Sequence, residues 1–321
     1  MTTLLFGNLA DQALLNLGLW LREMGYRFVT PTPATHAVVN ARQGSGMAKS
    51  IEDVFGWSRA FQPSLLPQTS LKLLEQAGAL AYDGLLLRST VRYSTLGDLI
   101  FVHSGFPTKE RDAVFFGPDT YRFTRLLAQV LRELKPVNGP DSIFDMCCGT
   151  GVGGIFVKTL LPHACEVVLA DINTKALHYA WVNAKLANTG SVVFRQGDMF
   201  DATPEHAALI IANPPYLLDR EARVYRDGGG ALGAGLSLRF VHEGLPKLKP
   251  GGTMILYTGV SIVKGKDTFL AAVTPALRSP SITFSYEEID PDVFGEELQQ
   301  MPYGGVDRIA AVGLAIHKAA G

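Results

Sequence analysis

The sequence predicts an α/β fold in which a mostly parallel sheet, covered by helices on both faces, follows a smaller and mainly helical N-terminal domain. Two observations indicate this arrangement. From residue 141 onward, short aliphatic segments alternate with helix-like segments, as in βα units whose strands are buried on both faces. Before residue 105, apolar residues recur at helical spacing instead. We therefore expect two domains, residues 1–105 and 106–321.

The first domain is expected to contain helices followed by a β-ribbon. The segments DQALLNLGLWLREMG and SLLPQTSLKLLEQAGAL carry the helical period. Residues 85–105 alternate apolar and polar residues around Leu96-Gly97-Asp98, which favours a short hairpin. Helices followed by such a ribbon resemble a winged-helix module, for which we expect a substrate-recognition or lid role.

The second domain is expected to begin with a connector and a helix, followed by seven strands. The helix has Asp119 as its expected N-cap and ends before Pro136. The last two strands leave little room for a helix between them, so we expect a hairpin that makes the final strand antiparallel. The expected strands are residues 142–147, 166–171, 191–195, 207–213, 252–259, 281–289 and 308–318.

Composition and charge limit the function classes. With 47% hydrophobic and 18% charged residues, the chain predicts a globular protein. Its 29 basic and 30 acidic residues give a net charge of −1, so nucleic acid is not a favoured partner. No apolar run approaches the ~20 residues that cross a bilayer, and we expect a cytoplasmic protein without membrane contact. The three cysteines, Cys147, Cys148 and Cys165, imply neither disulfides nor a metal site.

Polar residues follow four of the expected strands, where open parallel sheets bind their ligands. Glycines in Asp145–Gly154, DMCCGTGVGG, let the backbone come close to a ligand. Asp171 offers a carboxylate to the two hydroxyls of a ribose. Asp198-Met199 suits the amino group and ring face of an adenine, and Asn213-Pro214-Pro215-Tyr216 ends the fourth strand.

Other interpretations remain open for these motifs. Gly149, Gly151 and Gly154 also satisfy G-x-G-x-x-G, so an NAD-dependent oxidoreductase is an alternative, although it leaves Asp198 and the NPPY stretch unexplained. A binding protein with a nucleotide pocket but no turnover is another. Taken singly, each motif also has a purely structural interpretation, as a tight turn or a helix cap.

Together these motifs resemble the class I S-adenosylmethionine-dependent methyltransferases, and within them the HemK-like branch that includes the release-factor glutamine N5-methyltransferases. The resemblance covers about residues 110–317, and NPPY is its sharpest element. It implies a Rossmann-like sheet of seven strands, with S-adenosyl-L-methionine as cofactor and S-adenosyl-L-homocysteine as product. One stretch departs from the family: Gly117–Tyr121, GPDTY, stands where glutamine methyltransferases usually have Arg-Pro-Glu-Thr-Glu.

The resemblance also implies roles for particular residues. Asn213 and the Pro214 carbonyl would accept the N–H bonds of a nitrogen with a delocalised lone pair, and Tyr216 would stack on a planar group. The catalytic residues are then Asn213, Pro214 and Tyr216, and the substrate contacts are Pro215, Tyr216, Tyr121 and Tyr225. The cofactor contacts are Asp145, Cys147, Gly149, Thr150, Gly151, Asp171, Ile172, Asp198, Met199 and Asn213, with no metal.

Three kinds of methyl acceptor fit such a site. An amide or amino nitrogen of a protein or amino-acid-like substrate follows from the resemblance. An exocyclic base nitrogen in RNA or DNA is the second, because NPPY also serves base methyltransferases, but the chain lacks the basic surplus that nucleic-acid binding needs. An amine on a small metabolite is the third, with residues 1–105 as a lid or specificity domain.

Overall fold

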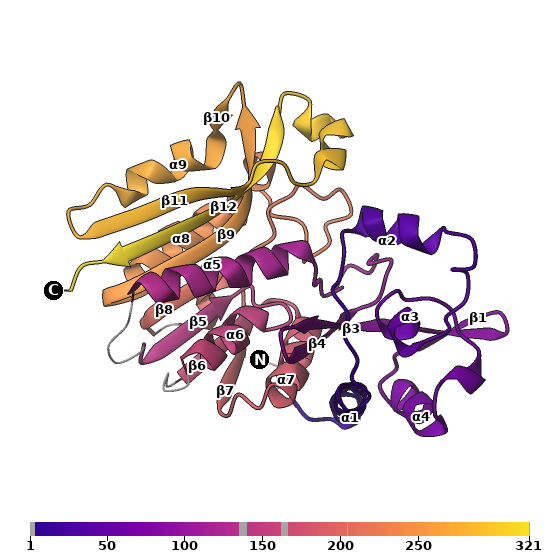
Figure 1. Ribbon diagram of the computed structural model, residues 1–321. Coiled ribbons are helices and arrows are strands. Elements are labelled where there is room, and N and C mark those ends of the chain that lie inside the picture. The colour runs from indigo at the N-terminus through magenta and orange to yellow at the C-terminus, as the bar shows by residue number, and fades with distance from the viewer. Residues whose placement is uncertain (1–3, 135–139, 162–165, 204, 321) are drawn as a thin grey trace.

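The computed structural model describes residues 4–134, 140–161, 166–203 and 205–320, and Figure 1 shows an N-terminal part beside a larger domain built on a sheet. Cys165 and Pro136, before which we expected a helix to end, lie outside the described residues. In the part of the chain that is described, no helix is both long enough and apolar enough to cross a bilayer.

The sheet has the expected strand directions. Its strands lie in the order β11-β12-β9-β8-β5-β6-β7, and the two-residue strand β10 pairs only with β9. The pairs among β5 to β9 are parallel, whereas β12 is antiparallel to both of its neighbours. The mostly parallel sheet with an antiparallel last strand is therefore confirmed. The strands are β5 (Ser142–Met146), β6 (Glu166–Asp171), β7 (Val192–Gln196), β8 (Ala207–Ala212), β9 (Leu248–Val263), β10 (Lys266–Asp267), β11 (Ile282–Asp290) and β12 (Arg308–Lys318).

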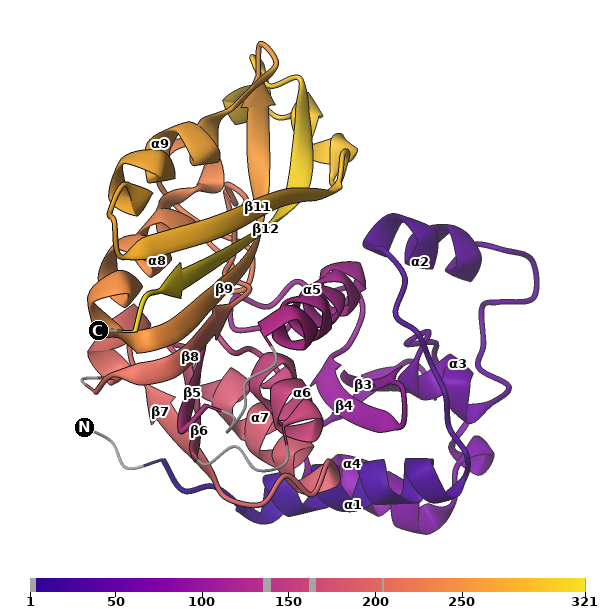
Figure 2. The same ribbon diagram turned by 60° about the vertical axis from the view of Figure 1, so that its left-hand side comes forward.

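Helices cover both faces of this sheet because alternate strand residues point to opposite faces and both sets are apolar. Ile143 and Leu169 face a core shared with α5, α6 and α7. Phe144 and Val168 face a second core, shared with α8 and α9. Figure 2 shows the sheet between these two layers. The helices are α5 (Pro118–Leu134), α6 (Val152–Leu160), α7 (Thr174–Leu186), α8 (Gly235–Lys247) and α9 (Thr268–Leu277), with short 3₁₀ turns at Met199–Ala202 and Ala231–Gly233.

The start of α5 differs from our expectation. We expected Asp119 as the N-cap and hence Thr120 as the first helical residue, but the helix begins at Pro118, whose fixed φ suits a first helical position. Thr120 accepts the Gly117 N–H through its hydroxyl at 3.2 Å. The carboxylate of Asp119 is buried and bonds to two tyrosine hydroxyls, so it is not used as a cap.

The connection from β11 to β12 contains no α-helix, as the sequence predicted. It holds two 3₁₀ turns instead, Gly295–Gln299 and Met301–Tyr303. These turns lie beyond the carboxyl ends of the parallel strands in Figure 1. They bring Phe294, Glu296 and Glu297 to the cavity described below.

The N-terminal part contains helices and two hairpins. The ribbon predicted around Leu96-Gly97-Asp98 is confirmed, since β3 and β4 pair antiparallel on either side of this turn. Residues 86–89 do not join that ribbon and instead form a hairpin with residues 80–83. The elements are α1 (Leu9–Glu23), α2 (Pro33–Asn40), α3 (Ile51–Phe55), the 3₁₀ turn Pro63–Leu65, α4 (Gln68–Gln76), β1 (Leu80–Asp83), β2 (Leu86–Ser89), β3 (Val91–Leu96) and β4 (Leu99–Ser104).

Helix α7 joins the N-terminal part to the sheet domain. Tyr179, Val182 and Leu186 on one side of α7 belong to the core of the N-terminal part, and Leu177 and Ala180 on the other side belong to the core under the sheet. Figures 1 and 2 both show α1 alongside α7. Because a single helix is buried from both sides, residues 4–105 are firmly packed against the sheet domain.

Candidate active site

A cavity of about 480 Å³ lies at the carboxyl ends of β5, β6 and β8. The parallel register puts the last residues of these strands side by side, since Met146 pairs with both Ala170 and Ala212. The volume is in the range of small-molecule and cofactor sites. The predicted site residues that line it are Asp145, Cys147, Gly149, Thr150, Asp171, Ile172, Asp198, Met199, Asn213, Pro214, Pro215, Tyr216 and Tyr225.

The loop after β5 is shaped by close packing on Asp145. This buried carboxylate accepts the Gly154 N–H at 2.7 Å, and burial raises the pKa of Asp145 to about 8. Gly151 lies outside the cavity lining and has a φ of 73°, which favours glycine. A Cβ at Gly151 would lie 2.8 Å from Leu169. Gly151 therefore allows the turn to pack closely on the core. Gly149, with open space around it, lines the cavity.

Asp171 ends β6 and is held in a fixed orientation. Its Oδ2 accepts the Gly149 N–H and its Oδ1 accepts the Asn173 N–H, both at 2.8 Å. Burial raises the pKa of Asp171, and these backbone bonds act in the opposite direction. The neighbouring Ile172 lines the cavity and is half exposed. A carboxylate so oriented suits the paired hydroxyls of a ribose.

Asp198 and Met199 both line the cavity, but Asp198 is half exposed and Met199 is buried. The two oxygens of Asp198 each accept a bond from Arg239 at 3.2 Å, and this side chain is half exposed. Met199 is buried, with its sulfur 3.5 Å from the Cys147 thiol. Burial, and to a smaller extent the charge of Asp171, raise the pKa of Cys147. Its thiol therefore stays protonated and lines the cavity as an apolar group, not as a nucleophile.

Asn213 follows β8 and is the polar side chain of the NPPY loop. It lines the cavity and is partly exposed, and within the described residues its side-chain amide has no hydrogen-bond partner. Pro214 and Pro215 follow it and also line the cavity. A free amide at the end of a core strand is available to an incoming ligand.

Tyr216 is anchored differently from the other loop residues. Its hydroxyl donates to Asp119 at 2.7 Å, and its ring lies edge-on to Phe294 at 5.9 Å between centroids. Burial, and then Asp119, raise the pKa of Tyr216 well above its usual value. Its hydroxyl therefore stays protonated and cannot serve as a base at neutral pH.

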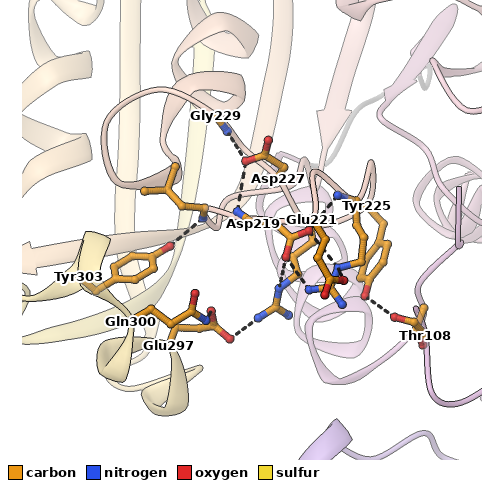
Figure 3. A network of polar contacts seen from close by, with 12 residues as sticks. Thr108, Asp219, Glu221, Tyr225, Asp227, Gly229, Glu297, Gln300 and Tyr303 are labelled. Atoms are coloured by element: carbon orange, nitrogen blue, oxygen red, sulfur yellow. Dashed lines mark hydrogen bonds and ion pairs between the residues drawn. The ribbon is translucent and has the colours of Figure 1, made fainter. Parts of the chain in front are cut away.

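The chain after NPPY, residues 217–229, is called the post-NPPY loop here, and Figure 3 shows the polar contacts that hold it. Within it, Arg223 pairs with Asp219 at 2.5 Å. Arg226 pairs with Glu297 from the turn between β11 and β12. The hydroxyl of Tyr303 accepts the Leu218 N–H at 2.8 Å. These contacts hold the loop, whose residues Leu217 and 223–226 line the cavity.

The two predicted substrate tyrosines outside NPPY occupy different positions. Tyr225 lines the cavity, donates to the Thr108 carbonyl at 3.1 Å (Figure 3) and stacks on Phe115 at 5.8 Å. Tyr121 does not line the cavity. Its hydroxyl donates to the Thr95 carbonyl and accepts the Thr30 N–H, both at 3.2 Å, which makes it a contact between α5 and the N-terminal part.

Asp119 and Asn183 are among the polar residues next to the site that sequence reasoning missed. Asp119 lines the cavity and holds Tyr216, although we expected only a helix cap. Asn183 on α7 donates to the Thr150 carbonyl at 3.0 Å and also bonds to Val102 of β4. A polar residue within a helix is usually solvent-exposed, so nothing local in the sequence indicates this role for Asn183.

No metal site is apparent in the described part of the chain: no group of three or more His, Cys, Asp or Glu side chains is placed to hold an ion. The fit to a nucleoside cofactor rests on different features. Asp171 is oriented by two backbone amides, and Gly149 leaves the space that a side chain would fill. Apolar Ile172 and Met199 complete the walls, so the residues present fit S-adenosylmethionine.

Comparison with known proteins gives consistent matches over the central region. Residues 109–260 match the family described as methyltransferase small domain. The release factor glutamine methyltransferase of Chlamydia trachomatis serovar L2 is 33% identical over 122 residues, which cover 36% of this chain and 41% of that protein. The release factor glutamine methyltransferase of Xylella fastidiosa strain 9a5c is 33% identical over 148 residues, which cover 42% of this chain and 52% of that protein.

The chain thus spans about half or less of the length of these curated relatives. Among solved structures, Trm5b from Pyrococcus abyssi superposes with a TM-score of 0.48 at 18% identity, covering 75% of this chain and 62% of that one. The match of residues 109–260 to the methyltransferase small domain and the similarity to these relatives support a HemK-like class I S-adenosylmethionine-dependent methyltransferase, with S-adenosylmethionine as its cofactor.

Proposed function

We propose that the chain is a cytoplasmic N-methyltransferase whose acceptor is an amide nitrogen of a protein, such as the side chain of a glutamine. The observation that carries this proposal is Asn213, which lines the cavity and whose side-chain amide has no hydrogen-bond partner among the described residues. The curated relatives are named release factor glutamine methyltransferases, which supports an amide acceptor.

The chemistry required explains the NPPY residues. When bound, S-adenosylmethionine supplies a methyl group that its bond to a sulfonium sulfur has already activated. An amide nitrogen is a poor nucleophile because its lone pair is delocalised, so the protein must hold it in position. The Asn213 side-chain oxygen and the Pro214 carbonyl oxygen would accept its two N–H bonds. Both dipoles are in place before positive charge develops on the nitrogen.

The remaining site residues would hold the cofactor. Asp171 would bind the ribose hydroxyls, and the backbone around Gly149 would lie against the cofactor without steric conflict. Met199 would contact the adenine ring, and Asp198 would share its carboxylate between the adenine amino group and Arg239. Pro214 and Pro215 limit the motion of the loop, so little entropy is lost when an acceptor binds.

We also propose that residues 1–105 form a recognition domain and residues 106–321 the methyltransferase domain. Pro33 of α2 lines the cavity, and the ring of Phe106, which also lines it, stacks on His36 at 4.0 Å between centroids. A fixed wall of this kind supports acceptor recognition. The packing of the N-terminal part on α7 argues against a lid that swings away.

Cofactor choice is tested by thermal unfolding with two ligands. S-adenosylhomocysteine at a hundred times its dissociation constant should stabilise the fold by about 2.7 kcal/mol. NAD at the same concentration should leave the melting temperature unchanged. Stabilisation by NAD alone would instead support the oxidoreductase alternative.

Replacing Asn213→Ala should lower turnover by about 10²- to 10³-fold, the usual cost of removing one preorganised polar group at a reacting centre. Its affinity for S-adenosylhomocysteine, measured by calorimetry, should stay close to that of the unchanged protein. Asn16→Ala, at an exposed position on α1, is the matched control and should leave both values unchanged. Full turnover in Asn213→Ala is incompatible with the role assigned to this side chain.

The acceptor class is tested by methyl transfer from labelled S-adenosylmethionine into protein, nucleic-acid and small-molecule fractions of a cell extract. The proposal expects label in protein, on an amide nitrogen, with purified release factor as the first defined acceptor. Asn213→Ala should slow this labelling in proportion to its lower turnover. Label found only in nucleic acid or only in small molecules would overturn the proposed acceptor.

A further inference from the structure

We propose that Asp119 is a positioning residue of the methyl-transfer site. Its buried carboxylate fixes the ring of Tyr216 and, through the two prolines, the position of Asn213. This inference rests on the proposed function, since it concerns how the same site is held in its active geometry. No residue at the start of α5 was expected to have this role.

The carboxylate of Asp119 is fully occupied by protein groups. Its Oδ2 accepts the hydroxyl of Tyr216 at 2.7 Å. Its Oδ1 accepts the hydroxyl of Tyr257 at 2.7 Å and a bond from Arg122 at 3.2 Å. The side chain is 8% exposed although the residue lines the cavity. Both oxygens are thus used, and Asp119 acts on the site through Tyr216 rather than by binding an acceptor.

The charge of Asp119 is balanced within the protein, which a buried carboxylate requires. Arg122, one turn further along α5, pairs with Asp119 and also with Asp290 of β11 at 2.7 Å. This chain of ion pairs fixes the first turn of α5 against the edge strand of the sheet. The carboxylate is therefore presented to Tyr216 from a rigid element, not from a loop.

The ring of Tyr216 is confined on its other sides as well. Gly259 of β9 lies so close that a Cβ there would be 2.3 Å from the Tyr216 ring. Phe294 meets the ring edge-on, with 5.9 Å between centroids. With the ring between these neighbours and the hydroxyl bound to Asp119, Tyr216 has one orientation.

The orientation of Tyr216 also determines the position of Asn213 in the NPPY loop. Asn213 is separated from Tyr216 by only Pro214 and Pro215, whose φ angles are fixed by their rings. A shift of Tyr216 therefore moves the Pro214 carbonyl and the Asn213 side chain instead of being absorbed by backbone rotation. Displacements of about 1 Å at a reacting centre are enough to cost large factors in rate.

The first test measures the mobility of Tyr216 without any acceptor. The full chain is labelled with 3-fluorotyrosine at its ten tyrosines, and the Tyr216 fluorine signal is the one lost in Tyr216→Phe. Relaxation measurements should show a ring in one orientation. Asp119→Leu, which keeps the shape but removes both acceptor oxygens, should give exchange broadening of this signal. Asp119→Asn keeps one acceptor oxygen, so its Tyr216 signal should be broadened less than in Asp119→Leu but more than in the unchanged chain.

The matched control is Tyr257→Phe, which removes a hydroxyl from the same carboxylate at a residue outside the cavity lining. It should leave the Tyr216 signal sharp. An unchanged Tyr216 signal in both Asp119 variants would overturn the inference. If Asp119→Leu fails to fold, Asp119→Asn decides alone.

The second test is a double-mutant cycle on methyl transfer into the protein fraction. Asp119→Asn should lower kcat about tenfold and leave the acceptor KM and the affinity for S-adenosylhomocysteine within about threefold, since one charge-assisted bond is weakened. If Asp119 acts through Tyr216, the double variant Asp119→Asn/Tyr216→Phe should be no slower than Tyr216→Phe alone. Additive losses would overturn the inference. Absence of any methyl transfer by the unchanged chain would contradict the proposed function, while the fluorine signals would still decide the role of Asp119.

Discussion

The carboxylate of Asp145, near the end of β5, packs against the first turn of α6 and leaves no room for a side chain on Gly153. An ideal Cβ at Gly153 would lie 2.8 Å from the ring of Phe123 and 2.9 Å from Asp145 Oδ2. Both neighbours are buried, so neither can move aside at low cost. Gly153 is thus required by the packing of the first turn of α6 against Phe123 and Asp145.

Gly153→Ala should therefore destabilise the fold by about 1–3 kcal/mol, the usual cost of overpacking a core. It should also weaken binding of S-adenosylhomocysteine, because Asp145 can only yield by moving the loop. Urea unfolding and calorimetry measure the two effects. Gly305→Ala is the control, since a Cβ at Gly305 would have no atom within 4 Å. Equal stability of the two variants would show that the loop has room to relax.

A side chain of helix α7, Asn183, makes polar contacts with both β4 and the loop after β5. The Asn183 side chain accepts the Val102 N–H at 2.7 Å and donates to the Val102 carbonyl at 3.1 Å, as a neighbouring strand would. It also donates to the Thr150 carbonyl at 3.0 Å. One fully buried amide thus satisfies the edge of β4 and the loop after β5.

Asn183→Ala should leave these three backbone groups without partners in a buried site. Each such group costs about 1–3 kcal/mol, so the free energy of unfolding should fall by about 3 kcal/mol or more. Hydrogen exchange of the Val102 amide should accelerate as well. Lys185→Ala, an exposed position on the same helix, should change stability by less than about 1 kcal/mol. A loss in Asn183→Ala no greater than this would contradict the bridging role.

The parallel strands β5 to β8 could be predicted from the sequence because each is a short run rich in aliphatic residues that is followed by turn residues. The same runs end in Asp171, Asp198 and Asn213, so the side of the sheet that binds a ligand could be predicted too. The residues that hold these groups could not. Asp119 and Asn183 act on partners 97 and 81 residues away, and no local pattern encodes such pairs. The roles assigned to the cavity residues stay predictions until the variants are measured.

The stability of the whole chain should depend on pH through His36, a buried histidine of the N-terminal part. His36 is fully buried, donates from Nε2 to the Trp57 carbonyl at 2.8 Å and has Arg92 beside Nδ1. Burial, and then Arg92, lower the pKa of His36 from 6.5 to about 4. Asp145 acts in the opposite direction, because its pKa of about 8 makes protonation favour the folded state.

A variant separates the contribution of His36 from that of Asp145. The unfolded chain binds the His36 proton near pH 6.5, but the folded chain binds it only near pH 4. Stability due to His36 is therefore complete above pH 6.5 and is lost as the pH falls through this window. Relative to His36→Gln, the unchanged chain should lose about 1.4 kcal/mol per pH unit between these values. Urea unfolding at several pH values measures this, and His242→Gln, at an exposed position, should follow the unchanged chain. Parallel pH profiles of stability for the unchanged chain and His36→Gln would rule out a contribution of His36 to the pH dependence.

Because α7 is buried from both sides, the sheet domain cannot be separated from the N-terminal part without exposing apolar side chains. A chimaera that fuses residues 106–321 to a foreign recognition module would leave Tyr179, Val182 and Leu186 facing water. If residues 1–105 recognise the acceptor, as proposed, a change of acceptor specificity by replacing them requires that the outward side of α7 be redesigned as well.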